Sequence, residues 1–393
     1  MLMKVVIGTG ASVSISLGVA SVAGAADVLV QPFLDFGALR DDNIELAPGS
    51  HPSTSGFVVA ARLNIEHKTE TSKTKFLGSS AWTNYNRADI EDKNEQGLFL
   101  NTEKRTSERG TLGLDSEYRR DALFESTTAQ PGTGNVRDTD VGLSTRTEVR
   151  RSYLSAQPSW NWLLTERSAM RFAYRLTDVG FSHEVGTGLV GYREHFASVT
   201  YSRQLTAKDD FNLTTNLVRY EPDRANAEAD TKQLLAGITR AFSEQVRGSI
   251  ALGASRTNEQ EPGREESSSG TVAVATLRQS HDYSTLEGVI SSDVAPSGIG
   301  RSVRSDQIRV YWTRKVAPEI EFVLDAQLLR NRALEGTDPN IDRRYYEIAP
   351  QLRWHWLENV YIIGSFRHRQ QKFDAQSNSA DSNAVFLGVS YSL

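Results

Sequence analysis

Apolar and polar residues alternate along most of this chain. In residues 383–393, Val385, Leu387 and Val389 share one face, while Gly388 and Ser390 lie on the other. Because successive side chains of a strand point to opposite faces, this alternation predicts β-strands that are apolar on one side. A soluble antiparallel sheet over a core has the same pattern. The pattern therefore predicts the secondary structure, but whether the apolar face contacts lipid or a protein core must be decided from other features.

The alternating segments predict an all-β chain of about 18 strands, with about 16 or 20 as the alternatives. The first five strands are the least well defined, and residues 137–149 fit either a loop or a further strand. The predicted strands are 28–39, 55–66, 74–86, 96–105, 109–120, 146–163, 169–183, 190–205, 210–221, 230–242, 246–258, 268–279, 283–293, 303–315, 319–332, 342–357, 360–373 and 381–393.

The connections between these strands alternate between short and long. Tight turns and long loops alternate in this way in transmembrane barrels, where the turns are periplasmic and the loops extracellular. The sequence thus predicts one antiparallel transmembrane β-barrel, and an even strand number places both chain termini on the periplasmic side. Short connections include 165–168, 206–209 and 358–359; long ones include 40–54, 121–137, 184–189, 259–267, 294–302 and 334–341.

Charged residues fall on the face opposite the apolar rows. In strand 319–332, Ile320, Phe322 and Leu324 alternate with Glu321 and Asp325. Burying many ions in a dry core costs too much free energy, so a water-filled interior is favoured. An alternative role for these charged residues is to stabilise the barrel wall as cross-strand ion pairs. The residues expected to line the lumen are Arg62, Asp115, Glu117, Arg119, Arg171, Arg175, Arg309, Glu321, Asp325, Glu347, Arg353, His355, Arg367 and Arg369.

The first residues have the features of a secretory signal peptide. Lys4 precedes an apolar run over 5–22, and Ala23-Gly24-Ala25 forms a small-residue cleavage site. A membrane anchor is disfavoured because Gly8 and Gly10 dilute the run. We therefore expect a cleaved signal peptide at 1–25 and a barrel over 26–393, located in the bacterial outer membrane.

Composition narrows the function further. The chain has no cysteine, which excludes disulfides and thiol chemistry. A net charge of -5 gives no support for nucleic-acid binding. The seven histidines are scattered singly, so we expect no metal site and no cofactor. No G-x-S-x-G nucleophile elbow occurs, and we expect no enzyme. Trp160, Trp162, Trp354 and Trp356 precede short turns and are expected to form an aromatic girdle at the lipid boundary.

Several short segments resemble one family of bacterial proteins. They are similar to outer-membrane β-barrel porins associated with exopolysaccharide and exosortase gene clusters. The resemblance implies a barrel and no catalytic residues. Leu393 stands where such chains usually end in phenylalanine, so we expect weakened recognition of the last strand by the barrel-assembly machinery. The segments that carry the resemblance are Val30–Leu34 with Arg40–Ile44, Pro296–Gly300 with Val303–Trp312, Arg344–Pro350 with Arg353–Trp356, Phe366–Phe373 and Asn383–Leu387.

Three functions fit these expectations. The first is a channel that passes polar solutes, including a secreted exopolysaccharide, through a hydrated lumen, with extracellular loops such as Asp121–Arg137 folded inward. The second is a structural barrel, or one that anchors a periplasmic or extracellular partner, without transport. The third is a hydrolase embedded in a barrel, whose serine, histidine and aspartate would meet only in the fold. Outer-membrane lipid is the expected partner in every case, and polysaccharide or periplasmic export components are expected in the first.

Overall fold

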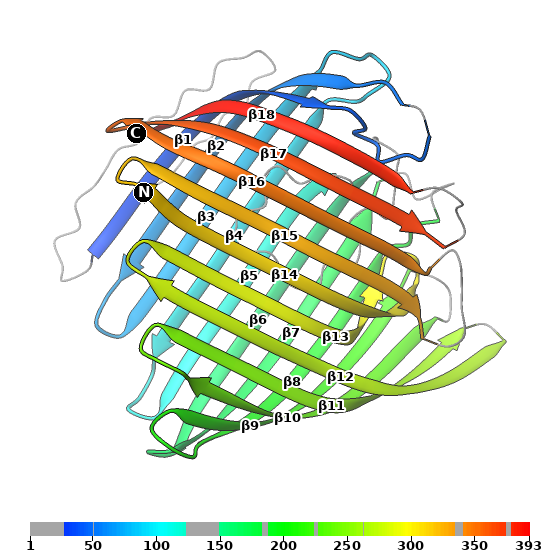
Figure 1. The fold of residues 1–393 in the computed structure, drawn as a ribbon. Coiled ribbons are helices and arrows are strands. Elements are labelled where there is room, and N and C mark those ends of the chain that lie inside the picture. The colour runs from blue at the N-terminus through cyan, green and yellow to red at the C-terminus, as the bar shows by residue number, and fades with distance from the viewer. Residues whose placement is uncertain are drawn as a thin grey trace, which may run out of the picture.

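The computed structural model describes residues 27–49, 51–122, 149–182, 188–223, 227–261, 263–334, 341–374 and 379–393. They form one closed antiparallel sheet of 18 strands (Figure 1). The strands are β1 (Asp27–Asp41), β2 (Thr54–Lys68), β3 (Ser72–Tyr85), β4 (Lys93–Arg105), β5 (Gly110–Ala122), β6 (Arg150–Thr165), β7 (Ser168–Phe181), β8 (Tyr192–Gln204), β9 (Asp209–Pro222), β10 (Glu228–Ala241), β11 (Val246–Glu261), β12 (Arg264–His281), β13 (Ser284–Ser297), β14 (Arg301–Ala317), β15 (Ile320–Ala333), β16 (Arg343–Leu357), β17 (Val360–Phe373) and β18 (Ala380–Ser392).

Each strand pairs with its neighbours in sequence, and β1 closes the sheet against β18. Phe36 of β1 lies opposite Val59 of β2 on one side and opposite Val389 of β18 on the other. This closure leaves no free sheet edge, so the ladders satisfy the strand backbone without water. The all-β barrel, its strand number and the position of every predicted strand are confirmed within a few residues at each end.

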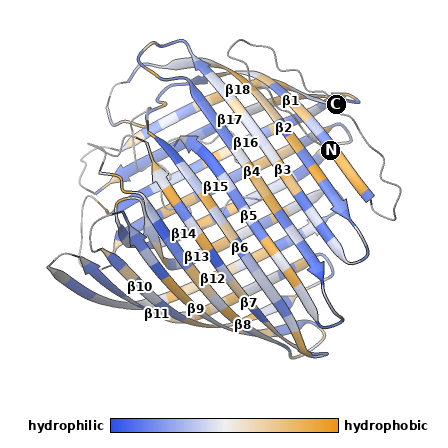
Figure 2. Ribbon diagram, turned by 180° about the vertical axis from the view of Figure 1, so that it is seen from behind, coloured by the Kyte–Doolittle hydropathy of each residue, from blue (hydrophilic) through white to orange (hydrophobic). Residues whose placement is uncertain are grey.

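The outer surface of the barrel is apolar. Ile290, Ile308 and Leu328 lie side by side on β13, β14 and β15, and their exposed fractions are 57%, 42% and 48%. Along the strands, apolar residues alternate with polar ones (Figure 2). A contiguous apolar surface of this extent on a closed barrel is solvated by lipid rather than water. The barrel therefore spans a membrane.

Two of the predicted long loops are strand instead. β11 and β12 are joined at 262–263, and β13 and β14 at 298–300, where the sequence predicts loops over 259–267 and 294–302. The strands extend because these residues continue the ladder, down to pairs such as Glu259–Glu266 and Ala295–Val303. The alternation of short and long connections consequently fails at these two hairpins.

The hairpin formed by β13 and β14 also leaves the plane of the sheet. Pairing between β12 and β13 stops at Ala273 and Ser292, although β13 continues to Ser297. Val294, Ala295 and Val303 are all nearly inaccessible, so both faces of this end are covered. We call residues 294–303 the hairpin tip. Its covered faces explain why alternation does not reveal it as strand.

The described residues include no helix long and apolar enough to cross a membrane. The predicted signal peptide at 1–25 lies outside the described residues, as does most of the predicted loop Asp121–Arg137.

Candidate pore and its inner wall

Contacts that skip a strand identify the inner face of the barrel. The Arg369 guanidinium on β17 reaches the Asp41 carboxylate on β1 at 2.8 Å, across β18. The Gln233 amide on β10 donates to the Asp293 carboxylate on β13 at 2.6 Å, across two strands. Side chains of strands that are not adjacent meet in this way on the concave side of a curved sheet. The register places these residues opposite the exposed apolar rows.

The same register puts all fourteen residues expected in the lumen on this inner face. Thirteen of them are engaged by other side chains or by a backbone carbonyl. Eight of them engage in five arginine–carboxylate contacts. Four of these contacts join adjacent strands, namely Arg62–Asp35 at 2.7 Å, Arg175–Glu194 at 2.7 Å, Arg309–Asp325 at 2.9 Å and Arg353–Glu321 at 3.2 Å, and Arg119–Glu117 at 2.8 Å lies within β5. Asp115 accepts from Asn101, Glu347 accepts from the Tyr345 hydroxyl, His355 contacts the Glu358 carbonyl, and Arg367 and Arg369 face Asp41.

Arg171 differs from the other thirteen. Its side chain is exposed, and it forms no ion pair with any residue in the described ranges. It lies on β7 opposite Asn161 and Thr200, toward the end with the short turns. An unpaired guanidinium on this face supplies a fixed positive charge that an anionic solute can meet.

The walls differ between the two ends of the barrel. Toward the short turns, the pairs keep contact with solvent: the side chains of Arg353 and Glu321 are 33% and 35% exposed. Toward the long loops, the Arg151–Asp121 pair is 4% and 2% exposed. Glu95 and Arg343 are equally covered at that end. The inner wall is thus hydrated at the turn end and closely packed at the loop end.

A small recess lies in the inner wall between β4 and β7. Its volume is about 190 Å³, and the carboxylates of Asp115 and Glu117 and the guanidinium of Arg175 border it. The Arg119 guanidinium lies 4.7 Å from the ring centre of Tyr153, and that of Arg175 lies 4.8 Å from Phe196. Aromatic faces hold the arginines in place while their carboxylate partners neutralise them. The lining residues are Phe99, Asp115, Ser116, Glu117, Tyr153, Ser155, Gln157 and Arg175.

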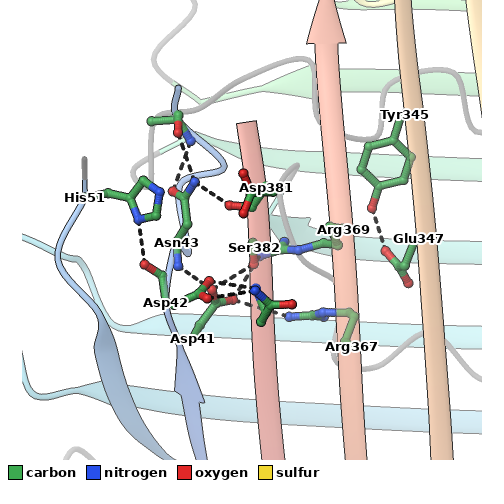
Figure 3. Close-up of polar contacts among 12 residues, drawn as sticks. Asp41, Asp42, Asn43, His51, Tyr345, Glu347, Arg367, Arg369, Asp381 and Ser382 are labelled. Atoms are coloured by element: carbon green, nitrogen blue, oxygen red, sulfur yellow. Dashed lines mark hydrogen bonds and ion pairs between the residues drawn. The ribbon is translucent and has the colours of Figure 1, made fainter. Parts of the chain in front are cut away.

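At the loop end, Asp41 of β1 contacts polar groups from β17, from β18 and from the loop that follows β1 (Figure 3). It is fully buried, and it accepts from Arg369 and Ser382 at 2.8 Å, with Arg367 at 3.8 Å. The backbone N–H of Asn43 donates to the same carboxylate at 2.9 Å. We call Asp41, Arg367, Arg369 and Ser382 the Asp41 cluster. It connects β1 to β17 where the loop between Asp41 and Thr54 begins. We call this loop the first long loop.

The loop that follows β1 folds onto the inner wall. The Asn43 amide donates to the carbonyl oxygens of Ala47 and Asp381, and Leu46 is buried against Leu329 and Tyr345. Leu46 has a φ of 48°, the left-handed region that a non-glycine residue rarely adopts. The surrounding contacts must therefore hold this backbone conformation. The loop narrows the barrel from the side of β15–β18.

The hairpin tip narrows the barrel from the other side. The Val190 N–H donates to the Gly298 carbonyl at 2.7 Å, and the Tyr220 hydroxyl donates to the Ser297 carbonyl at 2.8 Å. The Ser302 N–H donates to the Glu259 carboxylate at 3.0 Å. These contacts hold the hairpin tip against β9, β11 and the connection before β8. The loop end of the lumen is consequently bordered by two inward elements from different walls.

Sequence reasoning missed several inner residues that complete these groups. Asp35, Asp41, Asp121, Arg151 and Glu194 are each paired with an expected residue or its partner. Period-two alternation assigns all five to the inner face. Alternation gives their face but not their ion-pair partners, which depend on the strand register.

The described part of the chain holds no group of three or more acidic or histidine side chains suited to a metal ion. The tryptophans expected in the girdle lie at the turn end of the outer face. Trp354 and Trp356 are 43% and 56% exposed, and their ring centres are 6.5 Å apart. Trp160 packs with Trp162 at 5.4 Å.

No protein-family model matches the chain, and no curated protein matches it. Solved structures similar in fold include OpdQ from Pseudomonas aeruginosa, at 11% identity and a TM-score of 0.44, covering 93% of this chain and 99% of that chain. OccAB3 from Acinetobacter baumannii is similar at 8% identity and a TM-score of 0.46, covering 93% and 99%. OccK2 (OpdF) from P. aeruginosa, solved with glucuronate, shows 11% identity and a TM-score of 0.46, covering 94% and 98%. Each likeness concerns the fold alone.

The architecture itself sets the location of the protein. A closed antiparallel barrel with an apolar outer surface, short turns at one end and longer connections at the other is the outer-membrane type of barrel. The chain is a protein of the bacterial outer membrane.

Proposed function

We propose that this protein is an outer-membrane channel that passes polar solutes through a hydrated lumen. One observation carries the proposal: ion pairs of the inner wall at the turn end, such as Arg353 with Glu321, remain about one third exposed inside a closed barrel. Exposed ions in an enclosed space require water there. A barrel of about 18 strands is wide enough for such a pore.

Selection would take place at the loop end. The first long loop and the hairpin tip reduce the opening from two walls, so passage is restricted to what fits between them. Below them, paired charges of both signs offer hydrogen bonds to a polar solute, and Arg171 adds an unpaired positive charge. This arrangement supports small polar or anionic solutes.

A secreted exopolysaccharide is the finer expectation, and only the sequence resemblance supports it. Export of a polymer would require the two inward elements to move apart. Periplasmic export components would then be partners at the turn end. The barrel-assembly machinery is a proposed partner through β18, whose outer row Val385, Leu387 and Val389 is exposed.

A barrel that anchors a partner without transport is the second candidate. The close packing of the loop end favours it, since Arg369, Glu95 and Arg343 are nearly inaccessible there. A barrel whose lumen is closed at one end would conduct no ions.

Planar-bilayer recording separates the two candidates. The purified, refolded chain is expected to give stable single-channel steps, and swelling of proteoliposomes is expected with mono- and disaccharides. Swelling that extends to oligosaccharides would support the polysaccharide form. A correctly folded barrel that gives neither ion steps nor swelling would leave the anchoring function in place of the channel.

A further inference from the structure

Three cations lie abreast on the outer face of the barrel at the loop end. Arg330 of β15 is directly opposite Arg344 of β16, and Arg344 is directly opposite Lys372 of β17. All three side chains are exposed. They belong to the same strand face as the lipid-facing residues Leu328 and Ile348. We call Arg330, Arg344 and Lys372 the cation row.

The cation row is unfavourable for the protein alone. Directly opposite residues of an antiparallel pair have their Cβ atoms about 5 Å apart, and like charges at such positions destabilise the sheet. Among the residues that the structure describes, none forms an ion pair with any member of the row. The nearest acid in register, Asp306 opposite Arg330, is already bound by Arg332 and by the Ser292 hydroxyl at 2.7 Å. Asp381 of β18 also faces outward, but it lies opposite Gln370, which is two residues nearer the membrane than Lys372.

On the opposite wall, two outer arginines at the same end have carboxylate partners. On the outer face of β7–β10 at the same end, Arg193 pairs with Asp178 at 2.9 Å, and Arg219 pairs with Glu221 at 2.8 Å. Glu228 also binds Arg219. Arg193 and Arg219 are therefore neutralised within the protein, whereas the three cations of β15–β17 lie together without a carboxylate. Lys232 of β10 and Arg256 of β11 are also exposed and opposite each other, but they form a pair and not a row of three.

The height of the cation row indicates what neutralises it. Leu328, exposed on the apolar surface, lies two residues from Arg330, which is about 7 Å along the strand. Groups at that position meet the headgroups of lipids whose chains cover Leu328. Long connections mark the extracellular end of such barrels, so these headgroups belong to the outer leaflet. Guanidinium and ammonium groups bind phosphate through charge-assisted hydrogen bonds.

We propose that the cation row is a binding site for the phosphate groups of a phosphorylated lipid of the outer leaflet. The lipid supplies the missing negative charge and covers the apolar surface below with its chains. This site is on the outside of the barrel, so it does not depend on whether the lumen conducts. Phosphorylated lipid would then bind specifically to one wall of the barrel, the wall formed by β15–β17.

Native mass spectrometry of the detergent-solubilised barrel tests the proposal, with diphosphorylated lipid A as the probe and the same lipid without phosphates as the comparison. A basic residue near an anionic lipid surface contributes about fivefold to binding, so the triple variant Arg330→Gln, Arg344→Gln, Lys372→Gln should bind the probe about 100-fold more weakly. The matched control Arg150→Gln, Arg193→Gln, Arg219→Gln removes the same charge from outer-face arginines of β6, β8 and β9 that already pair with carboxylates of the protein, and it should bind as the unmodified protein does.

Heat-modifiable migration on a gel verifies that each variant is folded, and Arg344→Gln alone, with an expected loss of about fivefold, replaces the triple variant if it is not. Equal binding of both lipids, or no loss in the variants, would overturn the proposal. Displacement of the probe by millimolar inorganic phosphate with no contribution from the acyl chains would assign the site to a free anion instead. A self-association that the triple variant abolishes, with lipid binding retained, would make the row a contact between copies of the chain.

Discussion

Arginine–aspartate pairs occur at both ends of the lumen, but they differ in their exposure to water. At the turn end, Arg62 binds Asp35 with side chains 33% and 16% exposed, within reach of water. At the loop end, Arg369 binds Asp41 with side chains 1% and 0% exposed. A hydrated pair contributes little to stability, whereas a buried pair that loses one partner leaves an uncompensated charge. Pairs at the turn end therefore set the electrostatics of the lumen, and pairs at the loop end hold the structure that narrows it.

Replacing Asp41 should have the largest effect. The Asp41→Asn change leaves two arginines without their carboxylate in a buried site, which costs about 3–5 kcal/mol of the free energy of unfolding. Urea unfolding of the barrel in lipid vesicles measures this loss. Asp35→Asn is the matched control at the hydrated end and should cost about 1 kcal/mol or less. Equal losses at the two sites would remove the distinction between the ends.

Leu46→Ala should release the first long loop from the inner wall. Leu46 is 2% exposed and packs against Leu329 and Tyr345, and truncation of a buried leucine costs about 2–5 kcal/mol. Because the loop narrows the lumen, we expect higher single-channel conductance and faster proteolysis within 42–53. An unchanged conductance in a variant with a released loop would show that this loop does not restrict passage.

Tyr220→Phe should loosen the hairpin tip more mildly. The change removes the hydrogen bond from the Tyr220 hydroxyl to the Ser297 carbonyl and costs about 1 kcal/mol. The other contacts of the tip, from Val190 and Glu259, remain. Faster exchange of backbone amides in 294–303, measured against those of β15, is the expected result. Protection that does not change would mean that this bond contributes nothing to holding the tip.

Arg353→Gln should change selectivity with the smallest effect on stability. Its partner Glu321 is about one third exposed, so loss of the pair costs about 1 kcal/mol or less. The remaining carboxylate adds negative charge to the lumen, which shifts the reversal potential in a salt gradient toward preference for cations. Arg314→Gln, whose residue lies on the outer face opposite Phe322, removes the same charge and should leave the reversal potential unchanged.

The sequence predicted the wall of the barrel well and its loop end poorly. Lipid on one side and charge on the other impose a period of two, as in the alternation of Leu324, Asp325 and Ala326, and this period located every strand. The hairpin tip has both faces covered, so Val294 and Ala295 carry no alternation that separates strand from loop. The fold of the first long loop depends on contacts of Asn43 and Leu46 with strands more than 280 residues away in sequence, such as Leu329.

The inner residues were predictable as a class but not as groups. Alternation assigned Arg367 and Arg369 to the inner face. It could not show that both approach Asp41 across β18, because that contact depends on the closure of β1 on β18. The cation row on the outer face likewise depends on the register that sets Arg330, Arg344 and Lys372 opposite one another.

Site-directed labelling along β15 tests the central claim most directly, because the chain contains no cysteine. Single cysteines at Leu324, Ala326 and Gln327 sample both faces of one strand, two on the apolar outer face and one on the inner face. In proteoliposomes, a charged thiol reagent that does not enter lipid should modify Gln327→Cys rapidly and leave Leu324→Cys and Ala326→Cys unmodified. Lipid-soluble quenchers should show the reverse order. Equal protection of Gln327→Cys would contradict a hydrated lumen, and with it the proposed channel.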